Sequence, residues 1–434
     1  MYSLRIPLLL GILALGPVTP ALAQITLPQV QLPQLPVQTP DLNRTVGQVV
    51  NVTDPDQLRE LRRLRVRELL RTNRQVLEAD PRGAPIVRSE IVALSPSPEA
   101  LQSAQDAGFE IARRRALEGL DITMVVLRAP EGMSTRRALR TLQRADPGGV
   151  YDFNHLYMES GDAVSTQQQP ATPDVGRESP VAPTRLVGLI DGGVDRSHPV
   201  FQQSVLHEHG CEPAVPGAHG TAVASLLVAA ADFHAAASGV QLYVADVYCG
   251  VASGGAVDAV AEAFAWLTRE RVPVINVSLV GPANATLEQV IRVVLARGHI
   301  VVAAVGNDGP SAPPLFPAAY PGVIGVTAVD ARDHVLLEAC RGPQVSFAAP
   351  GADLSAAALE HNSALVRGTS FAAPVVAGLL AQNVTTPDRA NAERAVATLA
   401  SQAIDLGSRG RDPIYGQGLV GSGLRNKSVA LSKE

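Results

Sequence analysis

Hydrophobic positions divide the chain into two stretches with different periodicities. In the first stretch, helical spacing of apolar residues predicts helices at 56–78, 98–107 and 135–144. Short apolar runs predict strands at 86–94, 109–114, 122–127 and 150–158. After the opening helix the order is strand, helix, strand, strand, helix, strand. This order is typical of a small α+β domain with both helices on one face of an antiparallel sheet.

Beyond residue 184 the apolar runs become short, rich in β-branched residues and separated mostly by helical patterns. They predict five strands, at 185–190, 242–247, 274–279, 300–305 and 323–327. Such runs are typical of parallel strands buried on both faces, so we expect a doubly wound α/β domain with a mostly parallel sheet. Ligands in these folds bind at the carboxyl ends of the strands.

The first 23 residues have the composition of a signal peptide. Arg5 precedes an apolar run over 6–15, and the small residues Ala21 and Ala23 supply an A-x-A cleavage site. We therefore expect export to the periplasm or the medium, with no membrane anchor left after cleavage. An uncleaved anchor is the alternative, and the A-x-A ending speaks against it.

Two stretches rich in proline and glutamine, 24–43 and 161–183, predict linkers. They leave one domain at 44–160 and a second at 184–434, and both lengths are ordinary for single domains.

Charge argues against a nucleic-acid partner. From residue 162 onward the chain has 24 acidic and 17 basic residues, the wrong sign for binding phosphates. The first stretch balances 18 arginines against 17 acids, so its arginine-rich opening helix is interpreted as a solvated, ion-paired surface.

Three cysteines allow one disulfide and leave one thiol in an oxidising compartment. We favour Cys211 with Cys249 over pairings with Cys340, although the sequence leaves all three open. His207, His209 and Cys211 alternate and would share one face of a strand, as zinc ligands do. No fourth ligand is evident in the sequence, so we expect no metal site.

Three polar residues at the edges of apolar runs carry the candidate chemistry. Asp191 directly follows the run VGLI, His219 precedes an apolar helix, and Ser370 opens another. Each alone has an ordinary explanation, as a turn residue, a surface histidine or a helix N-cap. Together, in the order Asp, His, Ser, they match one known chain order of the serine-hydrolase triad.

The stretch from about Leu186 to Val420 resembles the catalytic domain of subtilisin-like serine proteases. The resemblance rests on motifs in the family's order, namely VGLIDGGVDRSHP, HGTAVAS, INVSLVGP, AAVGNDG, FPAAYPGVI, GTSFAAPVVAG and YGQGLV. It implies a serine endopeptidase in which Ser370 is the nucleophile, His219 the general base and Asp191 the carboxylate that orients the imidazole. The reaction would proceed through an acyl-enzyme on Ser370. Asn307 resembles the family's oxyanion asparagine.

The same resemblance implies how peptide or protein substrates bind. An extended peptide would add as a strand between two enzyme segments. The matching residues are Ser253, Gly254, Gly255, Ser278, Leu279, Val280 and Gly281, with Ala304 and Gly306 nearby. The family uses a cis proline beside this cleft, which implies a cis Phe316–Pro317 bond. No cofactor is implied, and the short connection 231–239 carries a single acid, which argues against the family's calcium loop there.

Two features depart from the simplest member of the family. Gly192 follows the catalytic aspartate where the family has Thr or Ser, and Val280 replaces a glycine. The domain at 44–160, with its predicted ferredoxin-like arrangement, resembles in position a propeptide that assists folding, inhibits the enzyme as its intramolecular partner and is then removed. The maturation site is expected within 161–183.

Two other functions compete with this interpretation. A lipase or esterase needs a later histidine and a G-x-S-x-G motif, but no histidine follows His361 and Ala372 replaces the second glycine. A catalytically impaired subtilisin-like protein that only binds peptides stays open. Labelling by an active-site serine probe separates it from an enzyme.

Overall fold

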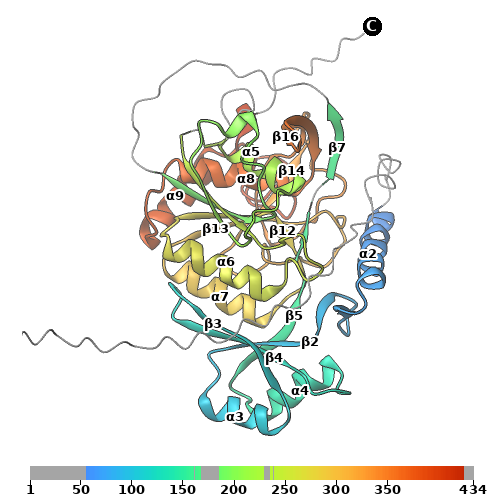
Figure 1. The fold of residues 1–434 in the computed structure, drawn as a ribbon. Helices are drawn as coiled ribbons and strands as arrows, with labels where there is room; N and C mark the ends of the chain where they lie inside the picture. The colour runs from blue at the N-terminus through green and yellow to red at the C-terminus, as the bar shows by residue number, and fades with distance from the viewer. Residues whose placement is uncertain (1–54, 161, 168–184, 229–234, 238, 425–434) are drawn as a thin grey trace, which may run out of the picture. The chain divides into compact units, whose positions relative to one another are not determined.

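The structure, a computed structural model, describes residues 55–160, 162–167, 185–228, 235–237 and 239–424 (Figure 1). The predicted signal peptide, the first linker and most of the second linker lie outside these residues. Part of the connection 231–239 also lies outside the described residues. No helix in the described ranges is long and apolar enough to cross a membrane.

The first domain forms the predicted ferredoxin-like arrangement. Its sheet has the strands β1 (Leu77–Ala79), β2 (Pro85–Leu94), β3 (Glu110–Leu117), β4 (Ile122–Arg128) and β5 (Val150–His155). The order β5-β2-β4-β3 is antiparallel throughout. Helices α3 (Pro98–Asp106) and α4 (Thr135–Ala145) share one core with a single face of this sheet (Figure 1).

Both faces of β2 are buried, which explains its unbroken apolar run IVAL. Ile91 and Ala93 pack with α3 and α4, whereas Val92 and Leu94 belong to a core shared with the second domain. Successive side chains of a strand point to opposite faces, so one strand serves both cores. The sheet is therefore a layer between its own helices and the rest of the protein.

Two boundaries predicted for this domain were wrong. The opening helix, α2, spans Pro55–Thr72 and stops short of residue 78, because the Asn73 side chain caps the Leu69 carbonyl and Leu77 enters β1. The predicted last strand divides into β5 and β6 (Met158–Glu159), and β6 leaves the domain to pair with β12 (Leu279–Val280).

The second domain is the predicted doubly wound α/β domain. Its parallel sheet consists of β8 (Leu186–Asp191), β9 (Leu206–His209), β10 (Gln241–Asp246), β11 (Val274–Val277), β13 (Ile300–Ala304), β14 (Ile324–Val329) and β15 (Val345–Pro350), in the order β15-β14-β13-β11-β8-β10-β9. The pattern missed β9 and β15. Both are edge strands: β9 (LHEH) is largely polar, whereas β15 (VSFAAP) is apolar but has a single β-branched residue.

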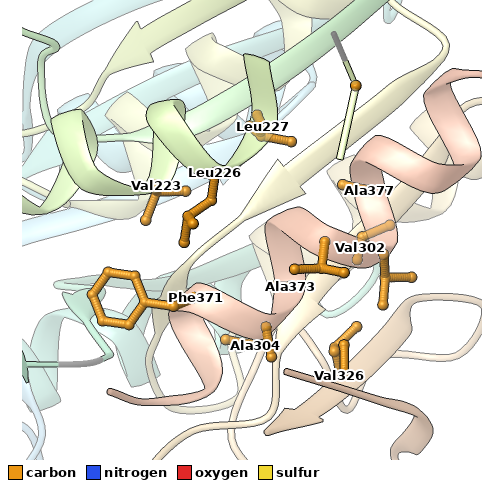
Figure 2. Close-up of a cluster of buried hydrophobic side chains, with 14 of the residues drawn as sticks. Val223, Leu226, Leu227, Val302, Ala304, Val326, Phe371, Ala373 and Ala377 are labelled. Carbon is orange, nitrogen blue, oxygen red and sulfur yellow. The ribbon is translucent and has the colours of Figure 1, made fainter. Parts of the chain in front are cut away.

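Helices cover both faces of this sheet. On one side α8 (Thr369–Ala381) packs against β13 and β14, and α5 (Ala218–Val228) packs against α8 and the neighbouring strands β8 and β10. Figure 2 shows Leu226 of α5, Phe371 of α8 and Val302 of β13 in this buried cluster. On the other side lie α6 (Val257–Arg269) and α7 (Ala285–Ala296). A further helix, α9 (Arg389–Gln402), lies against α8.

A third small sheet corrects the linker prediction. The hairpin β16 (Ala352–Ala358) and β17 (Asn362–Arg367) is joined by β7 (Asp162–Gln167). The first residues of the predicted linker thus form a strand, because β17 offers an unpaired edge to an extended segment.

The disulfide joins Cys211 and Cys249, the pairing that was favoured. Cys340 is a buried free thiol, and burial raises its pKa to about 12. His207 and His209 stack on Tyr243 and Trp266 respectively, so the alternating histidines and cysteine do not face a common metal. The Phe316–Pro317 bond is cis, as expected.

Candidate active site

Asp191 and His219 meet at the end of the central strand β8. Asp191 is fully buried, and its Oδ1 and Oδ2 lie 2.9 and 3.1 Å from Nδ1 of His219. The Gly192 N–H also donates to Oδ1 of Asp191, at 2.7 Å. Because an ionised carboxylate only accepts hydrogen bonds, Nδ1 carries the proton and Nε2 of the neutral ring is the basic atom.

The motif HGT allows α5 to approach the end of β8 closely. A Cβ at Gly220 would lie 2.2 Å from the carbonyl oxygen of Gly192 and 2.8 Å from that of Gly193. Only glycine avoids this collision, so Gly220 lets the first turn of α5 rest on the backbone beside Asp191. The position of His219 is therefore set by backbone packing as well as by its bond to the carboxylate.

Ser370 lies at the start of α8, immediately after a turn at Gly368 with φ of 137°. Its hydroxyl donates to the carbonyl of Ser278 (3.0 Å), and the Ser278 hydroxyl donates back to the carbonyl of Ser370 (2.9 Å). The ring of Phe371, the next residue, is 5.4 Å from the ring of His219. The structure thus brings the three predicted residues to one place from β8, α5 and α8.

Two donors near Ser370 face the end of the first domain. The backbone N–H of Ser370 donates to the carbonyl oxygen of Ser160 at 3.1 Å. Asn307 accepts from the N–H of Thr369 through Oδ1, so its Nδ2 points the other way and donates to Oγ of Ser160 at 3.2 Å. One of the two donors, the Ser370 N–H, therefore holds a peptide carbonyl, while the Asn307 amide bonds the side-chain hydroxyl of the same residue.

The residues before Ser160 occupy the cleft as an added strand. Leu279 pairs with Glu159 and Val280 with Met158, while the N–H of Tyr157 donates to the carbonyl of Gly255 (2.7 Å). These contacts lie on both sides of the segment, as expected for backbone recognition of an extended peptide.

Tyr157 anchors the far end of this strand. It is 1% exposed, its hydroxyl donates to the carbonyl of Pro282 (2.6 Å), and a Cβ at Gly281 would lie 2.7 Å from its ring. Burial raises the pKa of Tyr157 well above its ordinary value, so the phenol stays a donor. Tyr248 donates to the Tyr157 carbonyl from the opposite side (2.9 Å).

Glu159 places a carboxylate beside the Asp191–His219 pair. One ligand atom from each of the three residues lies within 4.8 Å of the others. The spacing would suit a metal, but Asp191 and His219 already bond to each other, so we interpret the pair as acid–base machinery. A Cβ at Gly192 would lie 3.6 Å from Oε1 of Glu159, so the missing side chain leaves room for this carboxylate.

The remaining predicted residues lie close by with different contacts. Ser253 and Gly254 bond within their own loop, to Ala256 and Val251, and Gly255 makes the contact to the bound strand. Ala304 is fully buried in the core beneath α8 (Figure 2). The Gly306 N–H donates to Oγ1 of Thr369 (3.1 Å), which links the Asn307 loop to the start of α8.

Sequence reasoning missed Tyr157, Glu159 and Ser160. They lie at the end of the first domain, where the residues YMES carry no recognisable motif. Backbone pairing selects them, and the pairing partner lies about 120 residues farther along the chain.

Comparison with known proteins gives concordant results. Residues 184–418 match the model of the family described as the subtilase family. Subtilisin DY from Bacillus licheniformis is 33% identical over 250 residues, covering 54% of this chain and 88% of the relative. An alkaline protease from Alkalihalobacillus alcalophilus is 30% identical over 285 residues, covering 61% of this chain and 72% of the relative.

Among solved structures, fervidolysin from Fervidobacterium pennivorans, a keratinolytic enzyme related to subtilisin, aligns with a TM-score of 0.62. The alignment covers 78% of this chain and 61% of that chain. Sequence identity is 19%, so this likeness concerns the fold alone.

Proposed function

Because the chain belongs to the subtilase family of serine endopeptidases, we propose that it is an exported, self-processing member in which Ser370, His219 and Asp191 cut peptide bonds. In this proposal the first bond cut is its own, between Ser160 and Gly161. Other peptides and proteins follow once the first domain has left the cleft.

The proposed reaction uses each group according to its contacts. Ser370 Oγ turns from the Ser278 carbonyl to Nε2 of His219, gives up its proton and attacks the substrate carbonyl. Asp191 holds the ring and stabilises the imidazolium. The amine of the leaving peptide takes the proton from His219 and departs. His219 then accepts a proton from water, which attacks the acyl group and releases it from Ser370.

Negative charge on the carbonyl oxygen would be stabilised by the Ser370 N–H and by the Asn307 amide. Neutral donors suit this role, because they interact most strongly once the charge has developed. The Thr369 N–H holds Oδ1 of Asn307, which supports the required orientation of the amide.

One observation carries the self-processing proposal: the carbonyl oxygen of Ser160 accepts from the N–H of the nucleophile, Ser370, at 3.1 Å. On one side of this carbonyl, β6 pairs with β12. On the other side, β7 pairs with β17 from Asp162 onward. The chain crosses the site as a substrate would, so the bond after Ser160 is the one presented for attack.

We assign residues 44–160 the role of propeptide, which inhibits the enzyme and assists its folding. Support comes from the sheet face containing Val92, Leu94, Met124 and Val126, which shares a core with α6 and α7. Because this face is buried against α6 and α7 of the folded second domain, its burial stabilises the folded enzyme with the first domain bound. After cleavage the strand 157–160 would stay in the cleft and block it until the domain dissociates.

A polar network strengthens the same interface. The Arg113 guanidinium donates to Glu90 of its own domain (2.9 and 2.6 Å) and to Asp258 at the start of α6 (3.0 and 2.7 Å). Asn154 donates to both carboxylates, at 2.9 and 3.0 Å. Because every member has partners in this largely buried network, separating the domains leaves Asp258 without the Arg113 cation.

Export is supported by the predicted signal peptide and by the Cys211–Cys249 disulfide, since such bonds persist in oxidising compartments. One of the similar curated proteins is named a minor extracellular protease, from Bacillus subtilis.

The test compares the native chain with Ser370→Ala after secretion, using mass spectrometry to read both termini. We expect the native protein to begin at Gly161 and the variant to keep the first domain. Ser401→Ala, on the exposed surface of α9, is the matched control and should mature normally. Maturation of Ser370→Ala expressed alone at the same bond would show that another enzyme makes the cut.

A further inference from the structure

Glu338 and Arg367 form an ion pair close to the start of α8. Nε of Arg367 lies 2.7 Å from Oε1 of Glu338, and Nη2 donates to Oε2 at 3.0 Å, so the contact is bidentate. The Glu338 side chain is 17% exposed and the Arg367 side chain 38%. A planar guanidinium that bonds both oxygens of a carboxylate is fixed in orientation as well as in position. The ion pair needs no residue of the first domain.

Arg367 is the last residue of β17 and stands three residues before the nucleophile. The next residue, Gly368, is held by its N–H, which donates to the carbonyl of Gly351 at 2.8 Å. Because Arg367 is bonded to Glu338 and Gly368 to Gly351, the main chain enters α8 from a fixed point. The direction of the Ser370 N–H follows from that entry.

The segment that contains Glu338 also holds the loop of Asn307. The carbonyl of Glu338 accepts from the N–H of Gly309 at 2.8 Å. The N–H of Cys340 donates to the carbonyl of Gly306 at 2.9 Å. Both ends of the loop are therefore bonded to the same short segment.

Core packing fixes this segment. Leu336 is 2% exposed, and its N–H donates to the carbonyl of Ala328 in β14 at 2.9 Å. Ala339 and Cys340 are fully buried. The carboxylate of Glu338 thus projects from a backbone that is anchored on both sides, which makes it a suitable reference point for the neighbouring elements.

We propose that Glu338 is a positioning residue for peptide hydrolysis, which fixes the separation of the two oxyanion donors by bonding Arg367. The inference rests on the proposed function, because it takes the Ser370 N–H and the Asn307 amide as those donors. They belong to two separate segments, and Glu338 bonds both: its carbonyl holds the Asn307 loop, and its carboxylate holds the end of β17. Such donors must be held within about 0.5 Å of the productive geometry.

Thr369 provides a direct link between the same two segments. Its N–H donates to Oδ1 of Asn307 (3.1 Å), and its Oγ1 accepts from the N–H of Gly306 (3.1 Å). Two segments joined at one place can still rotate about that place. The ion pair of Glu338 joins them at a second place, so it restricts this rotation and with it the angle between the two donors.

The experiment compares the mature native enzyme with Glu338→Ala and Arg367→Lys on a peptide with the sequence of residues 157–162. Lysine keeps the charge of Arg367 but cannot form two parallel hydrogen bonds. Removing an oxyanion donor costs about two to three orders of magnitude in kcat, so displacing one should cost less, about tenfold. We expect this loss in kcat for both variants and a KM within about twofold of the native value, after active-site titration to count folded enzyme.

The matched control is Glu393→Ala. Glu393 pairs with Arg389 on α9 (2.9 Å), where both side chains are largely exposed. This variant removes a carboxylate from an ion pair of the same chemistry, and it should keep the native kcat and KM.

A double-mutant cycle separates positioning from general weakening of the fold. In the Asn307→Leu background the donor held by the Glu338 segment is absent, so Glu338→Ala should lower kcat by no more than about threefold there. A general loss of structure would lower kcat by the same factor in both backgrounds, because independent effects on free energy add.

Three results would overturn the positioning role. In the first, the native enzyme hydrolyses the peptide, but both variants keep kcat within about twofold. In the second, Glu338→Ala lowers kcat equally in both backgrounds. In the third, neither variant yields folded enzyme, which would assign the ion pair to folding. The proposed function stands in all three cases. If the native protein does not hydrolyse the peptide, the proposed function fails and this inference fails with it.

Discussion

Arg62 on α2 forms an ion pair with Asp308, the residue after Asn307, with Nε 3.1 Å from Oδ2. Burial raises the pKa of Asp308, and the Arg62 cation opposes that shift. The helix that begins the described part of the first domain is thus tied to the loop that contains Asn307, the proposed oxyanion donor.

Replacing Arg62 with alanine should weaken the hold of the first domain after cleavage. The pair is only partly buried, so about 1 kcal/mol, or a several-fold effect, is the expected size. The measurement is the lag between appearance of the mature terminus and appearance of activity, which should shorten. Arg63→Ala is the control, because the ion pair of Arg63 within the described residues is with Glu60 of the same helix. Equal lags for the two variants would rule out the ion pair as a restraint.

Replacing Asn307 with leucine should lower kcat by about two to three orders of magnitude and leave KM almost unchanged. The size is that established for removing one oxyanion-hole donor in subtilisin. The reason is that the amide interacts most strongly with charge present only in the transition state. Steady-state kinetics on a peptide substrate measures both constants, and a loss of kcat below about threefold would remove Asn307 from this role.

Val280→Gly should widen the range of residues accepted before the scissile bond. Val280 is fully buried in β12 opposite Met158, and Ser160, which the proposed cut follows, is small. Each methylene of misfit is worth roughly 1 to 3 kcal/mol, so the native enzyme should prefer Ala, Val or Leu over Phe by tenfold or more. Peptides that differ only at that position provide the comparison. If the variant gains nothing for Phe or Tyr, Val280 does not shape the pocket.

Acid should loosen the first domain through Asp80. Burial raises the pKa of this carboxyl, but hydrogen bonds from His155, Ala84 and Arg82 outweigh burial and lower it below 3.8. A lowered pKa stabilises the folded state above pH 3.8, and this stabilisation is lost as pH falls through the lower, folded-state value. His155 also accepts from Asn284 at the start of α7 (2.9 Å), so the loss reaches the domain interface.

The measurement for Asp80 follows unfolding of the Ser370→Ala precursor by fluorescence as pH is lowered. Asp80→Asn should be less stable than its parent at pH 6, and the difference should shrink below pH 3.8. Asp106→Asn, on the exposed surface of α3, is a matched control. A constant difference between Asp80→Asn and its parent across this range would exclude the carboxylate as the cause.

The sequence predicted those parts of the site that depend on local structure. Asp191, His219 and Ser370 each stand where a regular apolar element begins or ends, so the pattern placed them together at the edge of the sheet. The small residues around His219 and Ser370 are needed for close backbone approach, which is a local requirement and visible in the motifs.

Long-range backbone pairing could not be predicted in the same way. β6 and β7 are short edge segments whose partners, β12 and β17, are distant in the chain. Nothing in MES or DAVSTQ specifies those partners, since the hydrogen bonds involve main-chain atoms. Within the predicted stretch 253–255, the residue whose carbonyl bonds to the N–H of Tyr157 is Gly255.

Residues 157–160 and 162–167 pair with β12, the Gly255 loop and β17 of the chain to which they belong. The proposed cut after Ser160 therefore needs no collision between two molecules, and its rate should be first order and insensitive to dilution. A single exported molecule would mature as fast as one in a crowded solution. Only dissociation of the severed domain would then respond to concentration, since at high dilution it does not rebind.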